Sequence, residues 1–575
     1  MARVARDCVM KTHELTRRLE VTLGPDTSEL SIRVGLHSGP VTAGVLRGDR
    51  ARFQLFGDTM NVASRMEHTS EKGRIQISKT TADLITRDGK GKWIRPRNEL
   101  VTVKGKGDLQ TYWLEIKSGQ FSVRDGSNED SSTSQLTKED ELFAISRESI
   151  SSSNTSTKLA SKLDRLINWN VEILGNLIKQ IMARRKENGA SISAEDFDAK
   201  VELTRGGTVL DEVKEIIALP DFDDNIAPSI LDYEAIQLSD IVVSQLRDYI
   251  HSIAMLHKNN PFHNFEHASH VVMSAVKLLG RIVAPSDIEY DIERKRLAST
   301  LHRHTYGITS DPLTQFSCCF GALIHDVDHP GVPNAQLIKE DPALANLYRQ
   351  KSVAEQNSID IAWRLFMEDR FTQLRTAICG TQVELQRFRQ LVVNSVMATD
   401  VMDKELKNLR NVRWDRAFAP SSTKPESPEA AAAAARDNVN RKATIVIEHL
   451  IQASDVAHTM QHWHVYRKWN AKLFTEMTLA YREGRADTDP ATFWYDGELG
   501  FLDFYIIPLA KKLKECGVFG VCSDEYLTYA MENRHEWAEK GREVVAELVE
   551  SLRPEAALTG GILDIVAENE HFTDE

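Results

Sequence analysis

Histidine and aspartate residues recur in three short segments that lie far apart in the chain. His263 and His267 stand in FHNFEHASHV, His325 and Asp326 in ALIHDVDHPG, and Asp455 in IQASDVAH. A divalent ion needs several ligands of this type converging in space, and the adjacent pair His325 and Asp326 lets one carboxylate turn toward two ions. A fold for this chain must therefore bring the three segments together, and the sequence predicts a two-metal site.

The composition is that of a globular chain with an acidic balance. With 575 residues, 41% hydrophobic and 27% charged, the chain can bury several cores, so two to four domains are expected. A net charge of -13 and a pI near 5.8 argue against a nucleic-acid partner, because a phosphate-tracking protein shows a basic excess on at least one domain. We therefore expect no nucleic acid among its partners.

Cysteine usage and hydropathy indicate the compartment. The six cysteines have no short paired spacing, so neither a zinc ribbon nor a disulfide framework is indicated. No apolar run reaches the roughly eighteen residues of a membrane span, and the first residues lack the apolar core of a signal peptide. We expect a soluble chain in a reducing, cytoplasmic setting.

Composition divides the chain into five parts. Short alternating strands and a helix characterise the first part, and the second is rich in Ser, Asn, Asp and Glu, which predicts a disordered linker. A helical connector follows, then a long region of helical periodicity without hairpin signals, and a short tail. The predicted boundaries are 1–117, 118–157, 158–223, 224–555 and 556–575.

Two segments have a more specific prediction. Between Leu159 and Arg185 apolar residues recur at helical spacing, which predicts a connecting helix. This helix can pack on the following domain or form a dimeric coil, and the sequence leaves both open. The later helical region is interrupted by SSTKPESPEAAAAAARD (Ser421 to Asp437), which is predicted to be a mobile surface loop.

The histidines and aspartates have a structural as well as a metal-binding interpretation. His263 and His267 stand four residues apart and project from one face of a helix, but such a pair also occurs on surfaces or in cores. The segment HDVDHPG adds His325, Asp326 and His329 directly after an apolar run. Burying these three titratable groups is costly unless they are paired. A salt-bridge network could pair them. A metal explains these residues better, because Asp455 also follows an apolar helical stretch, IVIEHLIQAS.

The order of several separated motifs resembles the class I cyclic-nucleotide phosphodiesterase catalytic domain. The motifs are HNxxH, HDVDHPG, ATD at 398–400, ASD at 453–455 and a late GF pair, and the resemblance covers about residues 224–552. It implies an all-helical, HD-type fold with a deep pocket floored by zinc and a second ion, magnesium or manganese. The implied activity is hydrolysis of a 3′,5′-cyclic nucleotide to the 5′-monophosphate in intracellular signalling.

The resemblance also implies the metal ligands. By motif match these are His267, His325, Asp326 and Asp455. Asp326 would bridge to the second ion, and a hydroxide held between the ions would be the nucleophile. Two cations lower the pKa of a shared water and neutralise the phosphodiester, which permits in-line attack at neutral pH.

Further catalytic positions follow from the same match. His263 corresponds to the family's general acid, which would protonate the departing 3′ oxygen. His329, Glu355 and Asp400 correspond to residues that orient waters on the ions. The chain departs from the family pattern in AEQNSID, where a pair of histidines usually follows the glutamate.

Four residues would bind the purine. Trp469 and Leu473 lie on one helical face and Glu498 and Phe501 on another, and Leu473 and Phe501 match the family's clamp on the base. Glu498 stands where the family places glutamine, and an ionised carboxylate only accepts hydrogen bonds. Guanine offers two adjacent donors, so cyclic GMP is expected to be favoured over cyclic AMP. A protonated or turned-away Glu498 is the alternative.

The N-terminal part resembles the second half of a class III nucleotide cyclase domain, a partial α/β, ferredoxin-like fold over about residues 1–116. The motifs are RVGLHSGPVTAGVL, FQLFGDTMNVASRM, GRIQIS and VTVKGKGDLQTYWL. Asn61 and Arg65 match the family's transition-state pair and Lys104 its phosphate contact, and such groups can stabilise charge on a triphosphate.

The family's two metal-binding aspartates belong to the first half of that fold, before the point that matches Met1. Cyclase activity is therefore not expected from this chain alone. An isolated half domain exposes a sheet edge and an apolar face, so we expect a homodimer or a cyclase-domain partner. Proteins of this arrangement commonly carry membrane spans upstream.

The predicted function is thus a metal-dependent cyclic-nucleotide phosphodiesterase. The main alternative is a non-enzymatic signalling module that binds nucleotide or dimerises without turnover, against which the intact ligand set argues. A narrower alternative is another helical metal phosphohydrolase acting on a different phosphate ester. The purine clamp of Leu473 and Phe501 argues against it.

Overall fold

The computed structural model divides the chain into two compact units, Met1–Arg165 and Leu166–Glu575. Each unit is described by itself. The residues whose structure is described are 1–23, 30–47, 51–97, 100–103, 107–115, 155–187, 207–220, 222, 233, 235–280, 282, 294–418 and 427–553. The predicted linker lies almost wholly outside these ranges.

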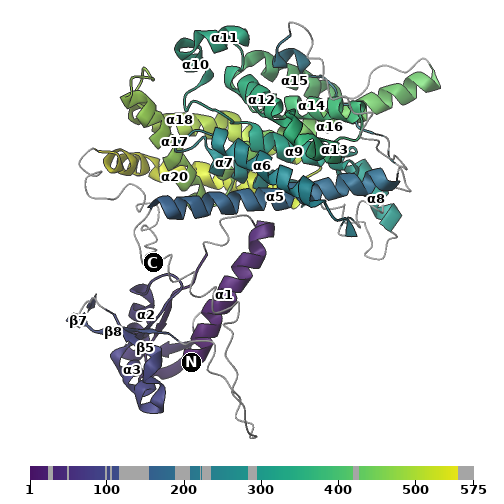
Figure 1. The fold of residues 1–575 in the computed structure, drawn as a ribbon. Coiled ribbons are helices and arrows are strands. Elements are labelled where there is room, and N and C mark those ends of the chain that lie inside the picture. The colour runs from purple at the N-terminus through teal and green to yellow at the C-terminus, as the bar shows by residue number, and fades with distance from the viewer. Residues whose placement is uncertain are drawn as a thin grey trace. The chain divides into compact units, whose positions relative to one another are not determined.

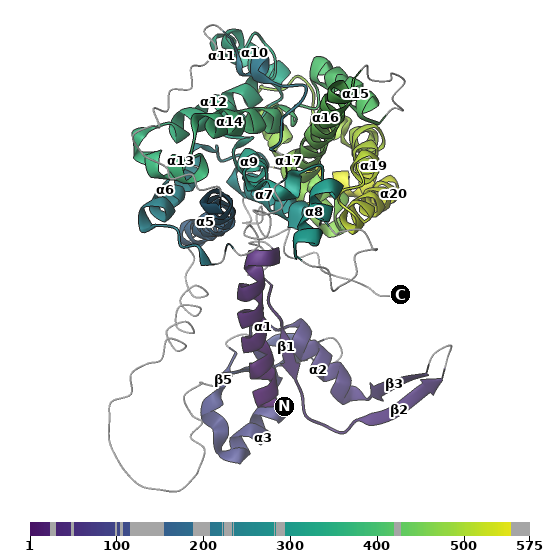
Figure 2. The ribbon, with the colours of Figure 1, turned by 90° about the vertical axis from the view of Figure 1, so that its right-hand side faces the viewer.

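The first unit combines a small mixed sheet with helices (Figure 2). Its four-stranded sheet has the order β1-β4-β8-β5, in which β1 and β4 are parallel and the other pairs antiparallel. Two further antiparallel pairs are β2-β3 and β6-β7. The elements are α1 (Ala2–Leu23), β1 (Val34–Leu36), β2 (Thr42–Arg47), β3 (Ala51–Phe56), α2 (Asp58–His68), β4 (Ile75–Ser78), α3 (Lys79–Ile85), β5 (Ile94–Pro96), β6 (Val101–Val103), β7 (Gly107–Leu109) and β8 (Thr111–Leu114).

Helices pack closely on this sheet. Ala5 of α1 is buried in one cluster with Ile77 of β4 and Leu114 of β8. At Gly35 of β1 an added Cβ would lie 2.0 Å from the backbone nitrogen of Glu67, so only glycine lets α2 approach the strand this closely. The expected N-terminal α/β region is confirmed.

The second unit is helical throughout its described residues, as predicted for the C-terminal domain (Figure 1). It begins within α5 (Thr155–Glu187). The helices that follow are α6 (Asp240–Leu256), α7 (Phe265–Gly280), α8 (Arg294–His304), α9 (Pro312–Ile324), α10 (Asn334–Glu340), α11 (Pro342–Leu347), α12 (Val353–Phe366), α13 (Thr372–Ile378), α14 (Gln382–Met397), α15 (Lys404–Phe418), α16 (Pro428–Asp455), α17 (Trp463–Arg482), α18 (Trp494–Phe501), α19 (Ile507–Glu515) and α20 (Val521–Ser551).

Helix α9 is the centre of this unit and packs against α7, α14 and α16 (Figure 2). All but one of its side chains are buried, in keeping with its nearly continuous apolar sequence. Pro312 starts the helix at a position where no amide donor is needed. A Cβ at Gly321 would lie 3.2 Å from Cβ of Ser395, so glycine allows α14 to lie against α9. This helix carries the second histidine motif into the core.

The predicted connecting helix is confirmed as α5, and its apolar face packs on the second unit. Leu174 and Ile178 are fully buried. Asn170 donates a hydrogen bond to the Ser269 hydroxyl of α7 at 3.0 Å, and Arg184 pairs with Asp311 at 2.7 Å. In the single chain the apolar face of α5 is thus covered by the second unit, and the dimeric coil stays a prediction.

The prediction of a surface loop from Ser421 to Asp437 is wrong for residues 428–437, which form the first part of α16. The Ser427 hydroxyl accepts a hydrogen bond from the amide of Ala430 at 3.1 Å, Pro428 occupies the first helical position, and a run of alanines follows. Serine caps, an initial proline and alanine all favour a helix. Residues 421–426 lie outside the described ranges.

Within the described ranges, no helix is both long and apolar enough to cross a membrane.

Candidate metal centre and adjoining pocket residues

Three helices deliver the four predicted metal ligands to one place in the second unit. His267 lies in the first turn of α7, His325 follows the last residue of α9, and Asp326 is next in the chain. Asp455 is the final residue of α16. The structure thus brings together side chains that are up to 188 residues apart in the sequence.

The ligand atoms of these residues are spaced as ligands of a single ion. Nε2 of His267 lies 3.1 Å from Oδ1 of Asp455 and 3.6 Å from Oδ2 of Asp326. Nε2 of His325 lies 3.1 Å from the same Asp326 oxygen and 3.4 Å from the same Asp455 oxygen. Four ligands at zinc distances in a tetrahedron are about 3.4 Å apart. The four His–Asp distances are close to this value, so the four side chains are candidate ligands of one cation.

Burial and charge at the cluster also fit a cation. Nδ1 of His325 lies 2.9 Å from the carbonyl of Ala322, which turns Nε2 toward the carboxylates. Nε2 of His325 and Oδ2 of Asp326 are buried, and neither makes a hydrogen bond of good geometry among the described residues. Burial alone would lower the pKa of His325, but Asp326 and Asp455 raise it well above its usual value. The carboxylates attract positive charge here, which a divalent ion supplies.

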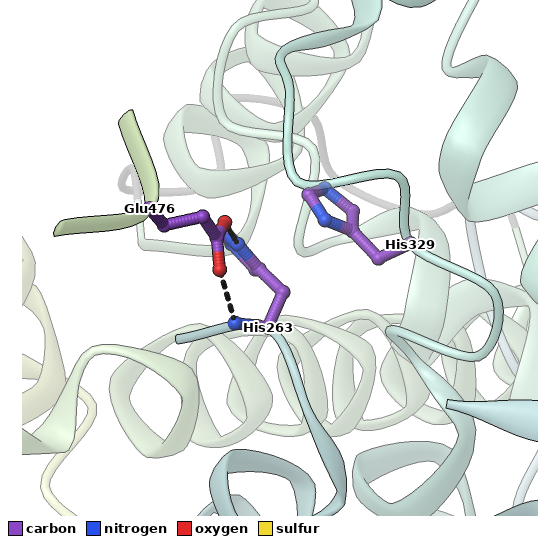
Figure 3. A group of neighbouring side chains, drawn as sticks. All are labelled: His263, His329 and Glu476. Carbon is purple, nitrogen blue, oxygen red and sulfur yellow. Dashed lines mark hydrogen bonds and ion pairs between the residues drawn. The ribbon is translucent and has the colours of Figure 1, made fainter. Parts of the chain in front are cut away.

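A second group of neighbouring side chains consists of His263, His329 and Glu476 (Figure 3). Nδ1 of His263 is 2.5 Å from Oε1 of Glu476, and the amides of Phe262 and His263 donate to Oε2 at 2.9 and 3.0 Å. The His329 ring lies over the His263 ring, with centroids 3.9 Å apart. Asn260 donates to the carbonyls of both histidines and so ties their two loops together.

Electrostatics give the two histidines different protonation states. Burial would lower the pKa of His263, but Glu476 and Asp326 raise it to about 9. Burial and the neighbouring His263 lower the pKa of His329 to about 3. Burial would raise the pKa of Glu476, but His263 lowers it to about 2. At neutral pH His263 is therefore a cation bound to a carboxylate, and His329 is neutral.

Two further carboxyl groups lie on the Asp326 side of the cluster. Burial, then the Asp400 carboxylate, with a smaller effect from Asp326, raise the pKa of Glu355 to about 7. Asn334 donates to Glu355 at 2.9 Å, and Ser352 donates to Asp400 at 2.7 Å. The Asp400 carboxylate disfavours the charged form of Glu355, so a cation beside the two groups would stabilise both anions.

The unusual AEQNSID segment supports the turn that carries Asp326. Asn357 donates to the carboxylate of Asp328 at 3.2 Å, and Ser358 donates to the carbonyl of Val327 at 2.7 Å. Asp328 has a φ of 63°, a left-handed conformation that aspartate tolerates better than most residues. Asn357 and Ser358, which replace the family's two histidines, thus stabilise the turn that follows Asp326.

Glu498, the residue predicted to contact the base, is buried on α18 and bonds to polar side chains of α17. The Tyr466 hydroxyl donates to its Oε2 at 2.5 Å, and Asn470 also bonds to it. Trp494 in turn donates to the Asn470 carbonyl at 3.1 Å. Burial raises the pKa of Glu498 to about 7, although both hydrogen bonds act against this shift. The carboxyl group thus titrates near neutrality.

The remaining purine-site residues differ in their surroundings. Leu473 and Phe501 are half-buried on α17 and α18. Trp469 is buried, and its ring centroid lies 5.7 Å from those of Phe262 and His267 and 4.9 Å from that of His270. Trp469 therefore packs against helix α7, which carries the candidate ligand His267, and its role toward a base stays a prediction.

In the first unit, Asn61 and Arg65 lie four residues apart on α2, with Asn61 exposed and Arg65 half-buried. Lys104 lies outside the described residues. The predicted nucleotide-binding role of all three stays a prediction.

Sequence reasoning missed Glu476, Tyr466 and Asn470. Glu476 stands 213 residues after its partner His263, so no local spacing links them. One signal was present: an acidic residue in the apolar stretch LFTEMTLA of a helix needs a buried partner.

Comparison with known families also distinguishes an N-terminal part of the chain from a C-terminal part. Residues 262–518 match the family model "3'5'-cyclic nucleotide phosphodiesterase", and residues 5–116 match "Adenylate and Guanylate cyclase catalytic domain". The chain also resembles the crystal structure of the phosphodiesterase domain of Salpingoeca rosetta rhodopsin phosphodiesterase, at 19% identity and a TM-score of 0.39, over 63% of this chain and 99% of that one.

Curated relatives match the N-terminal part. Soluble guanylate cyclase 89Da of Drosophila melanogaster is 49% identical over 89 residues, which are 16% of this chain and 13% of that protein. Guanylate cyclase 2G of Mus musculus is 42% identical over 111 residues, 19% of this chain and 10% of that protein. The chain thus spans about a tenth of the length of these relatives. The residues matched by the phosphodiesterase model lie in the second unit, and those matched by the cyclase model lie in the first.

Proposed function

We propose that the second unit hydrolyses a 3′,5′-cyclic nucleotide to its 5′-monophosphate, with cyclic GMP favoured over cyclic AMP. The observation that carries the proposal is the convergence of four ligand atoms at 3.1 to 3.6 Å beside a protonated histidine held by a carboxylate. Such a site combines a place for a Lewis acid with a proton donor, as phosphodiester hydrolysis requires.

The ligand set fits zinc at His267, His325, Asp326 and Asp455. A second ion, magnesium or manganese, would be held on the other side of Asp326, with Glu355 and Asp400 orienting its waters. When bound, these ions lower the pKa of a water and neutralise the negative phosphodiester. The ligand side chains would hold the ions, and the burial of His267, His325 and Asp326 would keep bulk water away from them.

His263 is the proposed general acid. Its Nδ1 is bound to Glu476, which leaves Nε2 as the nitrogen that can face the substrate. When water attacks phosphorus and the bond to the 3′ oxygen breaks, that oxygen needs a proton, and Nε2 of His263 supplies it. A pKa near 9 keeps this proton in place at neutral pH. Glu476 acts as the residue that positions His263.

The preference for cyclic GMP rests on Glu498. Tyr466 donates to one oxygen of this carboxylate and fixes its orientation. As an anion, Glu498 can accept from the N1–H and the exocyclic amine of guanine, whereas adenine presents an acceptor nitrogen beside its amine. Leu473 and Phe501 are the proposed clamp on the two faces of the purine. A purine-binding module without turnover would use the same residues.

A side-by-side hydrolysis assay tests the proposal. The purified chain is incubated with cyclic GMP or cyclic AMP in the presence of zinc and magnesium, and the 5′-monophosphate is measured. Asp455→Ala is the inactive comparison, and Asp487→Asn, which changes an exposed residue paired with Lys339, is the matched control. Turnover that Asp455→Ala abolishes and Asp487→Asn retains supports the enzyme. Nucleotide binding without turnover by the folded, metal-loaded chain supports the binding module instead.

A further inference from the structure

The helix after the clamp residue Phe501 contains a π-helical turn, Leu502–Ile506, before α19 continues. A π-turn accommodates one residue more than an α-helical turn and often marks a functional site. Two consecutive aromatic residues of this turn have different surroundings. Phe504 is 83% exposed, whereas the Tyr505 hydroxyl is buried.

Tyr505 lies against the proposed purine clamp. Its ring stacks on that of Phe501, with centroids 5.4 Å apart and an interplanar angle of 21°. Both rings come from one continuous helical segment, so the π-turn sets their relative orientation.

The Tyr505 hydroxyl has no hydrogen-bond partner among the residues that the structure describes. A buried hydroxyl without a partner costs free energy, and native proteins rarely retain one without a reason. Burial, followed by the Asp455 carboxylate, raises the pKa of Tyr505 well above its usual value. The Tyr505 hydroxyl is thus a buried donor without a partner among the described residues, and its ring contacts the clamp residue Phe501.

We infer that the Tyr505 hydroxyl donates a hydrogen bond to the sugar–phosphate ring of the bound cyclic nucleotide. The inference rests on the proposed function. If the purine lies at Phe501 and the phosphorus at the metal ligands, the sugar–phosphate ring joins them, and Tyr505, whose ring stacks on Phe501, lies at the purine end of that ring. The ring oxygens of a cyclic nucleotide are acceptors, which an O–H donor complements. Tyr505 is thus a substrate-binding residue supplied by the π-turn.

Tyr505→Phe tests this contact because it removes only the hydroxyl. We expect KM for cyclic GMP and cyclic AMP to rise by roughly tenfold, the upper range for one neutral hydrogen bond, with kcat within about twofold of wild type. The matched control is Tyr495→Phe, whose hydroxyl donates to the carbonyl of Ala538 at 3.1 Å. It is expected to leave KM unchanged.

The melting temperature of the nucleotide-free protein separates a binding role from a structural one. If the hydroxyl serves the ligand, Tyr505→Phe melts at or above the wild-type temperature, since an unpartnered buried group is removed. An unchanged KM, with or without a lower melting temperature, overturns the inference while leaving the proposed function intact. If the wild-type chain binds cyclic nucleotide without hydrolysing it, Kd replaces KM in the same comparison. If it neither hydrolyses nor binds them, the proposed function and this inference both fail.

Discussion

Glu476 binds His263 through three contacts: Oε1 lies 2.5 Å from the imidazole Nδ1, and Oε2 accepts from the backbone amides of Phe262 and His263. The carboxylate thus fixes both the ring and the loop that carries it. It also stabilises the charged form of the imidazole.

Glu476→Gln is expected to shift the pH dependence of catalysis. Glutamine can still accept from Nδ1 but lacks the charge, so the His263 pKa falls from about 9. A general acid acts only while protonated, so activity persists below its pKa and is lost as the pH rises through it. The alkaline limb of kcat/KM should therefore move to lower pH, with a loss of roughly tenfold or more at pH 8. Glu483→Gln, at an exposed position on the same helix end, is the control. An unmoved alkaline limb would show that Glu476 has only a structural role.

Asp455→Asn is expected to weaken metal binding as well as catalysis. The amide keeps the shape but loses the anionic ligand beside His267 and His325. For the wild type, zinc at 100 times its Kd should stabilise the fold by about 2.7 kcal/mol, seen as a higher melting temperature. The variant should show a much smaller shift and less bound zinc per chain by elemental analysis. Equal zinc content in both proteins would contradict the ligand assignment.

Glu498 is expected to make purine preference depend on pH. Its pKa is about 7, so its carboxyl group is protonated below and ionised above that value. Only the anion accepts from both guanine donors, so the ratio of kcat/KM for cyclic GMP over cyclic AMP should rise severalfold between pH 6 and pH 8. Glu498→Gln should give a ratio that is flat across this range. A raised carboxyl pKa also costs stability above pH 7, so the variant should melt higher than wild type at pH 8. A wild-type ratio independent of pH would exclude this role.

Arg413 and Glu448 are expected to stabilise the second unit only as a pair. They form a buried ion pair between α15 and α16, with side chains 0% and 5% exposed. Arg413→Met leaves the carboxyl group of Glu448 buried without its partner and should lower the free energy of unfolding by about 3–5 kcal/mol, measured by urea denaturation. The double variant Arg413→Met, Glu448→Met should recover part of that loss. A double variant less stable than the single one would contradict this account.

The sequence pointed to the four side chains that converge in the second unit because each lies in a short motif whose residue types have few other uses. It predicted α5 because its apolar residues follow helical spacing, and Leu174 and Ile178 are indeed buried. It did not predict Glu476, since the partnership with His263 exists only after α17 packs near the start of α7. The loop prediction for the alanine-rich segment is wrong from residue 428 onward, because Ser427 caps a helix that continues through the alanines.

Helix α5 contacts two elements that position the proposed metal ligands. Asn170 bonds to Ser269 on α7, the helix that carries His267, and Arg184 pairs with Asp311, the residue that begins the helix ending next to His325. Helix α5 therefore contacts the helices that carry two of the proposed metal ligands, and a substitution that disturbs α5 would reach both of them through these two contacts.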